Sequence, residues 1–210
     1  MARRKPRQRD QLQRKGPKRE PYDRVLIVCE GKKTEPLYFQ ALKDRCRLST
    51  ANVVITGSGS DPSSLINKAK SLQDEEKRRG DQYDAVYCVF DRDQHAHFNT
   101  ASNEALSAKL KLARSWPCFE FWLLLHFVYR RGPYAPSGNR SAADNCVGDL
   151  QQHLPNYTKG NAGVFETLEN QMETAKSNAG RALLDVKATG RCNPSTEVHC
   201  LVAYLQALKS

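Results

Sequence analysis

The sequence of 210 residues lacks several signatures of familiar enzyme and metal-binding classes. It contains no GxxxxGK[ST] motif, so any ATP hydrolysis connected with this protein must come from a partner. No CxxC pair occurs among the seven cysteines, which argues against zinc sites and disulfide frameworks. Most of these cysteines stand in apolar segments, and we therefore expect buried free thiols.

The sequence also lacks a long hydrophobic run. The longest one, 121–128, is far too short to span a bilayer, and the first residues contain no apolar stretch that would suit a secretory signal. We therefore expect no membrane association and a location in the reducing cytoplasm.

Acidic residues are scarce at the beginning of the chain. Up to Arg24 there are ten Lys and Arg residues against three acids, whereas the remainder is only mildly basic although the whole chain carries a formal charge of +10. Residues 1–23 have almost nothing to bury, so we predict a disordered basic tail. Two interpretations stay open for it: a solvated extension, or an arm that binds phosphates through counterion release.

Strand-like hydrophobic runs alternate with helical patterns up to about residue 114. The strand-like runs are 25–29, 52–56, 85–90 and 110–113. Helical patterns cover 34–42, 63–79, 97–106, the segment after Pro117, 142–153, 164–188 with a break near 178–180, and 197–208 with Ser195 or Thr196 as its cap. This order predicts an α/β core at 24–130, built on a parallel sheet flanked by helices, and a helical C-terminal extension at 131–210 packed on the core.

Acidic residues follow two of the predicted strands directly. Glu30 comes after the first strand, and Asp91 and Asp93 come after the third. The carboxyl ends of parallel strands meet at one edge of a sheet, where α/β folds bind their ligands. Two like charges at roughly 4 Å repel by about 4 kcal/mol at an effective dielectric constant near 20, so such a cluster needs a proton or a cation. Oxygen ligands without His or Cys favour Mg²⁺ or Mn²⁺.

Two other interpretations of the DxD pair remain open. Taken alone, the pair could be an ordinary turn at the end of a strand. The pattern of a hydrophobic strand followed by DxD also resembles the nucleophile motif of haloacid-dehalogenase phosphatases. That motif belongs on the first strand and has Thr or Val two residues after its second Asp, where this chain has His95.

Four blocks in this order resemble the RloB family: EGKKTEPLYF, VFDRDQH, PCFEFWLLLHF and NPSTEVHCLV. That family comprises bacterial TOPRIM-domain proteins encoded with an ABC-class ATPase, RloA, in restriction and abortive-infection loci. The resemblance covers nearly everything after the basic tail. One departure is Trp116, where the family pattern has Asn, which weakens any role for a polar side chain at that position.

The resemblance implies a TOPRIM, that is Rossmann-like, sheet and a set of acidic residues that are both catalytic and metal-binding. These residues are Glu30, Asp91, Asp93, Glu35 and Glu120. We interpret Glu30 as a general acid/base or bridging ligand, the two aspartates as the principal ligands, and Glu35 and Glu120 as holders of a second metal. Glu120 stands among aromatic residues, where a carboxylate is expensive to bury unless it is paired, or it could face solvent from a first helical turn.

Basic and histidine side chains beside the acidic motifs and in two later polar loops are candidates for binding nucleic acid. They are Lys32, Lys33, His95, Arg130, Arg131 and Lys159, each of which could equally be an ordinary surface residue.

Together these features predict a divalent-metal-dependent endonuclease of RNA, with tRNA as one candidate, or of DNA. By resemblance, it would be the effector of an anti-phage or abortive-infection system, with an RloA-type ABC ATPase as its partner. The alternative is a non-catalytic regulatory subunit that binds metal and nucleic acid. The sequence leaves a homo-oligomer open.

Overall fold

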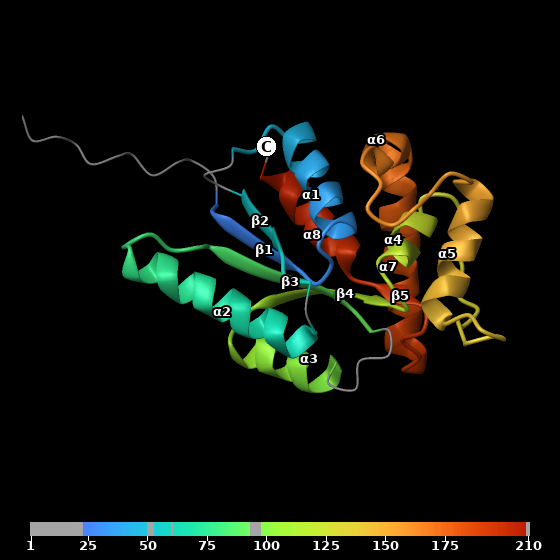
Figure 1. Ribbon diagram of the computed structural model, residues 1–210, viewed down its shortest axis with the longest axis horizontal. Coiled ribbons are helices and arrows are strands. Elements are labelled where there is room, and N and C mark those ends of the chain that lie inside the picture. Colours follow the sequence, from blue (N-terminus) through green and yellow to red (C-terminus); the bar gives the residue numbers. More distant parts are fainter. Residues whose placement is uncertain (1–22, 50–52, 60, 93–97, 209–210) are drawn as a thin grey trace, which may run out of the picture.

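The strand that carries the first acidic motif, β1 (Val25–Cys29), lies inside a five-stranded sheet with helices on both faces (Figure 1). The structure is a computed structural model, which describes residues 23–49, 53–59, 61–92 and 98–208. Residues 1–22 of the predicted basic tail lie outside these ranges.

The strand order in the sheet is β2-β1-β3-β4-β5. Strands β2 (Val53–Gly57), β1, β3 (Ala85–Asp91) and β4 (Lys111–Trp116) are parallel, while the two-residue β5 (Ser195–Thr196) pairs antiparallel with β4. The carboxyl ends of the four parallel strands therefore meet at one edge. The predicted α/β class with a mostly parallel, Rossmann-like sheet is confirmed.

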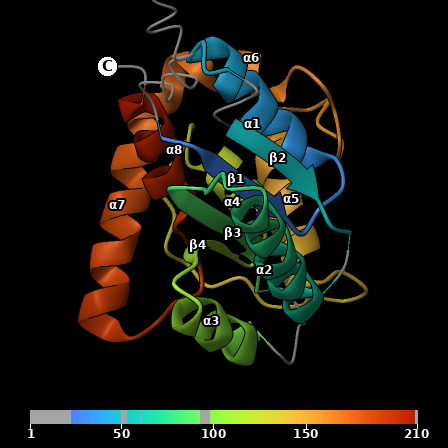
Figure 2. The same cartoon turned by 90° about the vertical axis from the view of Figure 1, so that its left-hand side faces the viewer.

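Helices cover both faces of the sheet. They are α1 (Thr34–Arg45), α2 (Pro62–Arg78), α3 (Phe98–Ser107), α4 (Glu120–Leu124), α5 (Ala142–His153), α6 (Val164–Leu168), α7 (Met172–Thr189) and α8 (Val198–Ala207), with a 3₁₀ turn, η1 (Glu169–Gln171), before α7. Helices α2 and α3 lie on one face, and α1 and α8 on the other (Figure 1). Helix α7 packs beside α8 (Figure 2).

The alternation of side chains along β1 explains why this strand is apolar throughout. Val25, Ile27 and Cys29 join the core under α1 and the C-terminal helices, whereas Leu26 and Val28 join the core under α2 and α3. All five side chains are fully buried. Burial of one such side chain stabilises the fold by roughly 1.5–3 kcal/mol, so both faces of this strand select hydrophobic residues.

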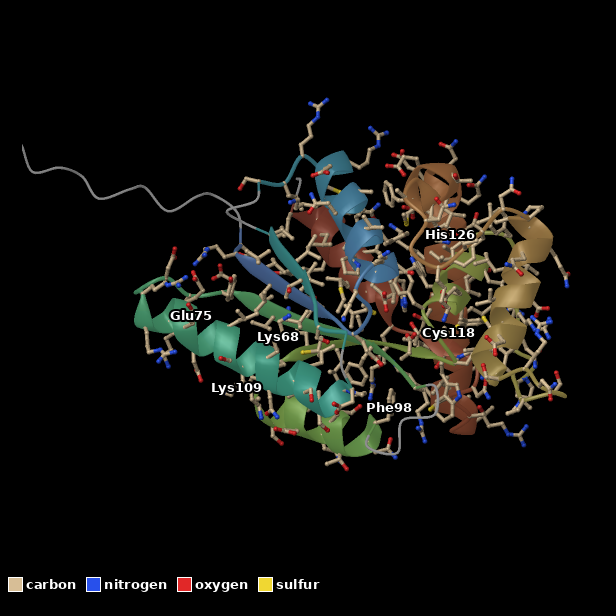
Figure 3. All side chains as sticks on the ribbon, viewed as in Figure 1. Lys68, Glu75, Phe98, Lys109, Cys118 and His126 are labelled. Atoms are coloured by element: carbon tan, nitrogen blue, oxygen red, sulfur yellow. The ribbon has the colours of Figure 1, made fainter. Side chains whose placement is uncertain are left out.

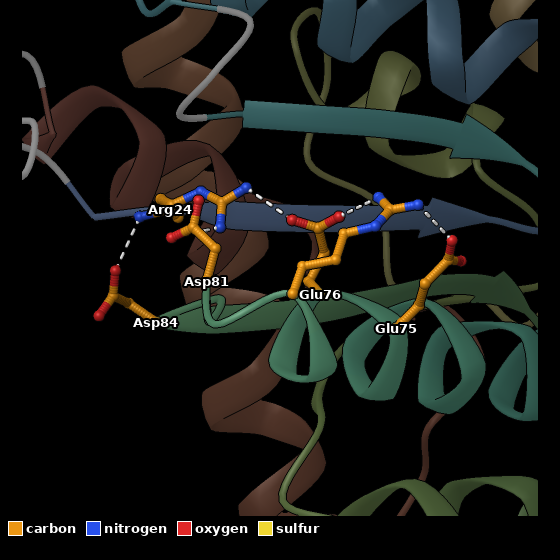
Figure 4. A network of polar contacts seen from close by, with 6 residues as sticks. Arg24, Glu75, Glu76, Asp81 and Asp84 are labelled. Carbon is orange, nitrogen blue, oxygen red and sulfur yellow. Dashed lines mark hydrogen bonds and ion pairs between the residues drawn. The ribbon is translucent and has the colours of Figure 1, made fainter. Parts of the chain in front are cut away.

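The amino-terminal edge of the sheet is held by a network of ion pairs around Arg24 (Figure 4). Its guanidinium lies 3.0 Å from the Glu76 carboxylate and 2.9 Å from that of Asp81, and its backbone N–H donates to Asp84 Oδ2 at 2.8 Å. These contacts tie the start of β1 to the end of α2 and to the turn before β3. Acidic residues at this edge therefore have a structural role.

Several predicted element boundaries require correction. The break expected near 178–180 is wrong, because α7 is continuous from Met172 to Thr189 and the interruption lies earlier, at η1. Gly180 does not break the helix, because a glycine inside a helix costs only about 1 kcal/mol. The buried stripe of Ala175, Ala179 and Ala182 continues past this residue.

The C-terminal extension is also not purely helical. Ser195 and Thr196 form β5 instead of capping a helix, and α8 begins at Val198. The pairing of Ser195 with Trp116 and of Thr196 with Ser115 joins the extension to the sheet. Strand β4 runs on to Trp116, beyond the predicted end at residue 113, because this pairing and that with β3 extend it. In the described part of the chain, no helix is both long and apolar enough to cross a membrane.

His126 predicts a pH-dependent stability. It is fully buried among the helices of the C-terminal half (Figure 3), where its Nδ1 faces the carbonyls of Trp122 and Leu123, and burial lowers its pKa to about 4. In the unfolded chain the imidazole of His126 takes up a proton near pH 6.5, whereas in the folded protein it does so only near pH 4. The contribution of neutral His126 to stability is therefore complete above pH 6.5 and is lost as the pH falls towards 4. Between pH 7.5 and pH 4.5 we expect this residue to remove roughly 2–3 kcal/mol of unfolding free energy.

Urea unfolding of wild type and His126→Gln at both pH values measures this contribution. The variant should lose less stability on acidification than the wild type, whereas His153→Gln, which changes an exposed histidine, should follow the wild type. Equal losses for His126→Gln and wild type would contradict the prediction.

Candidate active site

A cavity of about 610 Å³ opens at the carboxyl edge of the sheet, where β1 and β3 end. Its wall is unusual in being rich in charged side chains of both signs. The acids are Glu30, Glu35, Asp61, Asp91 and Glu120, and the bases are Lys32, Lys33 and Lys159. Four of the five acids predicted from the sequence therefore share one cavity.

The ends of the two neighbouring strands fix Glu30 and Asp91 relative to one another. The backbone N–H of Glu30 donates to the carbonyl of Val89 at 2.8 Å, which continues the β1–β3 pairing by one residue. The Glu30 carboxylate then accepts a hydrogen bond from the backbone N–H of Asp91 at 3.0 Å. The sequence predicted that Asp91 would be the first residue beyond the strand, but it is the last residue of β3.

Glu35 reaches the cavity because the chain turns sharply between β1 and α1. A Cβ on Gly31 would lie only 2.0 Å from Glu35 Oε2, so only glycine leaves room for this carboxylate. The side chain is 6% exposed, and backbone N–H groups of Gly31 and of Glu35 itself donate to it. The predicted position of Glu35 in the first turn of a helix is confirmed.

Glu120 comes from the first turn of α4 and is 2% exposed, so the alternative that it faces solvent is wrong. The buried Tyr157 hydroxyl donates to Glu120 Oε1 at 2.9 Å, and Lys159 Nζ lies 3.9 Å from the same oxygen. Both partners belong to the loop between α5 and α6. The C-terminal extension therefore supplies part of the cavity wall.

The same loop also contacts the turn before α1. The backbone N–H of Gly160 donates to Thr34 Oγ1 at 2.9 Å, and Gly160, at φ +78°, packs against the side chain of Lys33. On the opposite wall Gly59, at φ +62°, leaves the space that the stem of Lys32 crosses. Two glycines from distant loops thus let two lysines lie along the rim of the cavity.

The carboxylates of the cavity oppose one another's ionisation. Burial, followed by the nearby Glu35, Glu120 and Glu30 carboxylates, raises the pKa of Asp91 well above its ordinary value. Burial and the charges of Glu120 and Glu30 likewise raise the pKa of Glu35. Asp61 differs, because the Ser64 hydroxyl and backbone N–H groups at the start of α2 donate to it and lower its pKa. A divalent cation bound among these acids would offset their mutual repulsion and favour their ionised forms.

These residues suit a divalent cation in chemistry but do not form a finished site. Among the described residues, no group of three or more His, Cys, Asp or Glu side chains is already placed to hold a metal ion. Asp93, the second acid of the DxD pair, lies outside the described residues. The donor set consists of hard carboxylate oxygens that repel one another, which is the environment that Mg²⁺ or Mn²⁺ relieves.

The candidates for nucleic-acid binding divide into three groups. Lys32, Lys33 and Lys159 line the cavity, whereas His95 lies outside the described residues. Arg130 and Arg131 do not line it. Arg130 pairs with Asp149 at 2.6 Å, and Arg131 donates to the carbonyls of Pro194 and Arg191, which ties the loop after α4 to the chain before β5. Their contact with nucleic acid stays a prediction.

The sequence did not indicate that Thr34 and Asp61 line the cavity. Thr34 meets Gly160 across 126 positions of the chain, and no local pattern signals such a pairing. Asp61 carries a recognisable signal, but it is that of a helix cap, which is the role it fills.

The opposite pKa shifts of Asp91 and Asp61 give a test by matched substitutions. Because the folded state raises the pKa of Asp91, its ionised form destabilises the fold at neutral and higher pH, and this loss disappears as the pH falls. Asp91→Asn should raise the melting temperature in metal-free buffer, more at pH 8 than at pH 5. A shift of a few degrees is expected, since 1 kcal/mol corresponds to roughly 2–4 °C in a domain of this size.

Asp61→Asn makes the same substitution in the same cavity, but at a carboxylate whose ionised form the fold stabilises. It should leave the melting temperature unchanged or lower it, because hydrogen bonds favour the charged form of Asp61. Differential scanning calorimetry of both variants checks this. A melting temperature for Asp91→Asn below that of the wild type at pH 8 would show that the cavity is not crowded with charge.

Comparison with known proteins adds one match. No curated protein and no solved structure matches the chain. A family model described as RloB-like protein matches residues 25–205 of the 210, a range that contains Glu30, Glu35, Asp91, Asp93 and Glu120. With the sheet, its acidic edge and this match taken together, the chain belongs to the RloB-like family.

Proposed function

We propose that this protein is a divalent-metal-dependent endonuclease that cleaves phosphodiester bonds of RNA or DNA. The observation that carries the proposal is the convergence of Glu30, Glu35, Asp91 and Glu120 in one cavity whose rim is lined by lysines. The cavity lies at the edge of a parallel sheet where α/β folds bind ligands. The carboxylates of the cavity offer a metal site and the lysines at its rim offer a place for phosphate, and the reaction needs both.

Mg²⁺ or Mn²⁺ held by these carboxylates would act as a Lewis acid on the phosphoryl group. Asp91 is the principal metal ligand in this proposal, because the charges of all three glutamates act on its carboxyl group. Asp93 would complete the set from the same strand end. Glu35 and Glu120, from the starts of α1 and α4, would hold a second ion.

The chain's own side chains have separate tasks in the proposal. Glu30 accepts a proton from the attacking oxygen or donates one to the leaving oxygen. The backbone N–H of Asp91 donates a hydrogen bond to the Glu30 carboxylate and keeps that carboxylate directed into the cavity. Lys32 and Lys33 neutralise the phosphate backbone at the rim. Tyr157 holds Glu120 in place, and Lys159, which pairs with Glu120 here, exchanges that contact for a phosphate oxygen when substrate enters.

The biological setting proposed here is bacterial defence. Membership in the RloB-like family supports such a role, and an RloA-type ABC ATPase is the proposed partner. The absence of a P-loop motif from the sequence fits a division of labour in which the partner hydrolyses ATP. The basic residues 1–23 are the proposed arm for nucleic acid or for the partner.

A matrix of metals and substrates tests the proposed activity. Purified wild type should cleave at least one of tRNA, single-stranded RNA, single-stranded DNA or duplex DNA with Mg²⁺ or Mn²⁺, with or without the ATPase encoded beside it. Asp91→Asn and Glu30→Gln should reduce the rate by about 10²–10⁴-fold, the range expected for loss of a positioned acid or base. Glu104→Gln, which changes a surface ion pair between α2 and α3, should cleave at the wild-type rate.

Each outcome of this matrix has a meaning. Robust cleavage by Asp91→Asn would refute the assignment. Absence of cleavage with every metal, combined with salt-sensitive nucleic-acid binding that Asp91→Asn leaves intact or improves, would favour the non-catalytic regulatory subunit.

A further inference from the structure

Two cations and two aromatic rings pack together at the carboxyl edge of the sheet, beside the acidic cavity. The guanidinium of Arg92 lies 5.1 Å from the ring centre of Trp116 and 5.2 Å from that of Phe98. The two rings meet edge to face at 6.4 Å, and the Arg114 guanidinium lies 5.8 Å from Phe98. We call these four residues the stacking cluster.

The sheet places the stacking cluster next to the proposed reaction centre. Arg92 follows Asp91 directly, and its backbone N–H donates to the carbonyl of Ser115 at 2.8 Å. Since Asp91 pairs with Ser115, Trp116 stands one residue past the position opposite Asp91. Figure 3 shows Phe98 at the beginning of α3, near the same edge of the sheet.

Alternation along the strands directs the two groups to opposite sides of this edge. Phe90 belongs to the core under α2 and α3, and Arg92 meets Phe98 of α3 on that side. Val89 belongs to the other core, and the Asp91 carboxyl shares the cavity with Glu120 of α4 on that side. A nucleic-acid strand that crosses the edge at Asp91 would therefore bring a neighbouring base over the stacking cluster.

The stacking cluster is held in place but is not closed off. Phe98 is 8% exposed and forms its floor, whereas Trp116 and Arg92 are half-buried. Arg114 is anchored from behind by a two-point ion pair with Glu197, at 2.8 Å and 2.5 Å. The pairing of Trp116 with Ser195 of β5 fixes the backbone that carries the indole. Rigid aromatic and guanidinium planes are the surfaces on which unpaired bases stack.

We propose that the stacking cluster binds an unpaired nucleobase of the substrate next to the cleaved phosphodiester, with Trp116 as its main stacking surface. This inference rests on the proposed function and deepens it, since it assigns the substrate class as single-stranded or unpaired nucleic acid. A base in a duplex is already stacked on both sides, so it cannot use such a surface without leaving the helix. Specificity for unpaired segments follows from the cluster, while the phosphate contacts supply general affinity.

Binding in metal-free buffer with EDTA tests the proposal independently of cleavage. The probes are a 12-nucleotide oligo(dT), a 12-nucleotide oligo(rU), and an abasic 12-mer that carries the same phosphates without bases. The chain has two tryptophans, and Trp122 is fully buried, so a change of emission on binding reports on Trp116. At least one oligonucleotide with bases should quench this emission and bind more tightly than the abasic probe.

Substitution of Trp116 separates stacking from charge. Trp116→Ala should weaken binding of the preferred oligonucleotide by about 5- to 100-fold and leave the abasic probe unaffected, while Trp116→Phe should recover part of the affinity. The salt dependence of binding should stay the same, since the substitution removes no phosphate contact. Circular dichroism melting shows whether each variant is folded, and Trp116→Phe keeps the test open if Trp116→Ala does not fold.

The proposal is overturned if the abasic probe binds as tightly as both oligonucleotides, or if folded Trp116→Ala binds them as the wild type does. A lowered melting temperature with unchanged binding would assign the cluster to structure alone. None of these outcomes depends on metal or on turnover. A failure of the stacking proposal therefore leaves the nuclease proposal standing, and the reverse also holds.

Discussion

The structure depends on one electrostatic constraint, the convergence of like charges at the end of a buried sheet. Parallel strands bring their carboxyl ends to one edge, and this chain places Glu30 directly after β1 and Asp91 at the end of the neighbouring β3. Burial first, and then the charges of the neighbouring carboxylates, raise the pKa of Asp91 and that of Glu35. A stable domain keeps such an arrangement only if something else offsets the repulsion.

The surrounding structure serves this arrangement in specific ways. Gly31 leaves the space that Glu35 needs, and the Tyr157 hydroxyl donates a hydrogen bond to one oxygen of Glu120. Lysines at the rim partly offset the charge, and the Nζ atom of Lys159 lies 3.9 Å from Glu120 Oε1. The opposite edge is organised differently, because the acids around Arg24 are neutralised by a guanidinium at hydrogen-bonding distance. The acids of one edge are thus paired with a guanidinium, whereas those of the other edge line a cavity.

Much of the fold could be predicted from the sequence, because its signals are local. An unbroken apolar run such as Val25–Cys29 has one good environment, a strand buried on both faces, and Glu30 follows directly at its carboxyl end. Element boundaries that depend on the pairing of distant segments could not be predicted from the sequence. Ser195 and Thr196 look like helix caps, and only their pairing with β4 makes them a strand.

The same distinction applies to the candidate site. Glu30, Glu35 and Asp91 could be assigned because they are tied to the ends of predicted strands and helices. The burial of Glu120, the hydrogen bond from Tyr157 and the contact of Gly160 with Thr34 depend on how a loop of the C-terminal extension folds back. The stacking cluster also depends on tertiary structure, since Arg92 follows β3, Phe98 begins α3, and Arg114 and Trp116 belong to β4. Trp116 stood out in the sequence only as a departure from the expected family pattern.

The central proposal is that the clustered carboxylates bind a divalent cation, and that this cation favours their ionised forms and so releases protons to solvent. Isothermal titration of Mn²⁺ into the protein near pH 6.5, in two buffers with different ionisation enthalpies, measures both the binding and the protons released. The account predicts saturable binding with net proton release, and Glu30→Gln or Asp91→Asn should weaken the binding and reduce the release. Absence of Mn²⁺ binding, or binding that releases no proton and survives both substitutions, would contradict it.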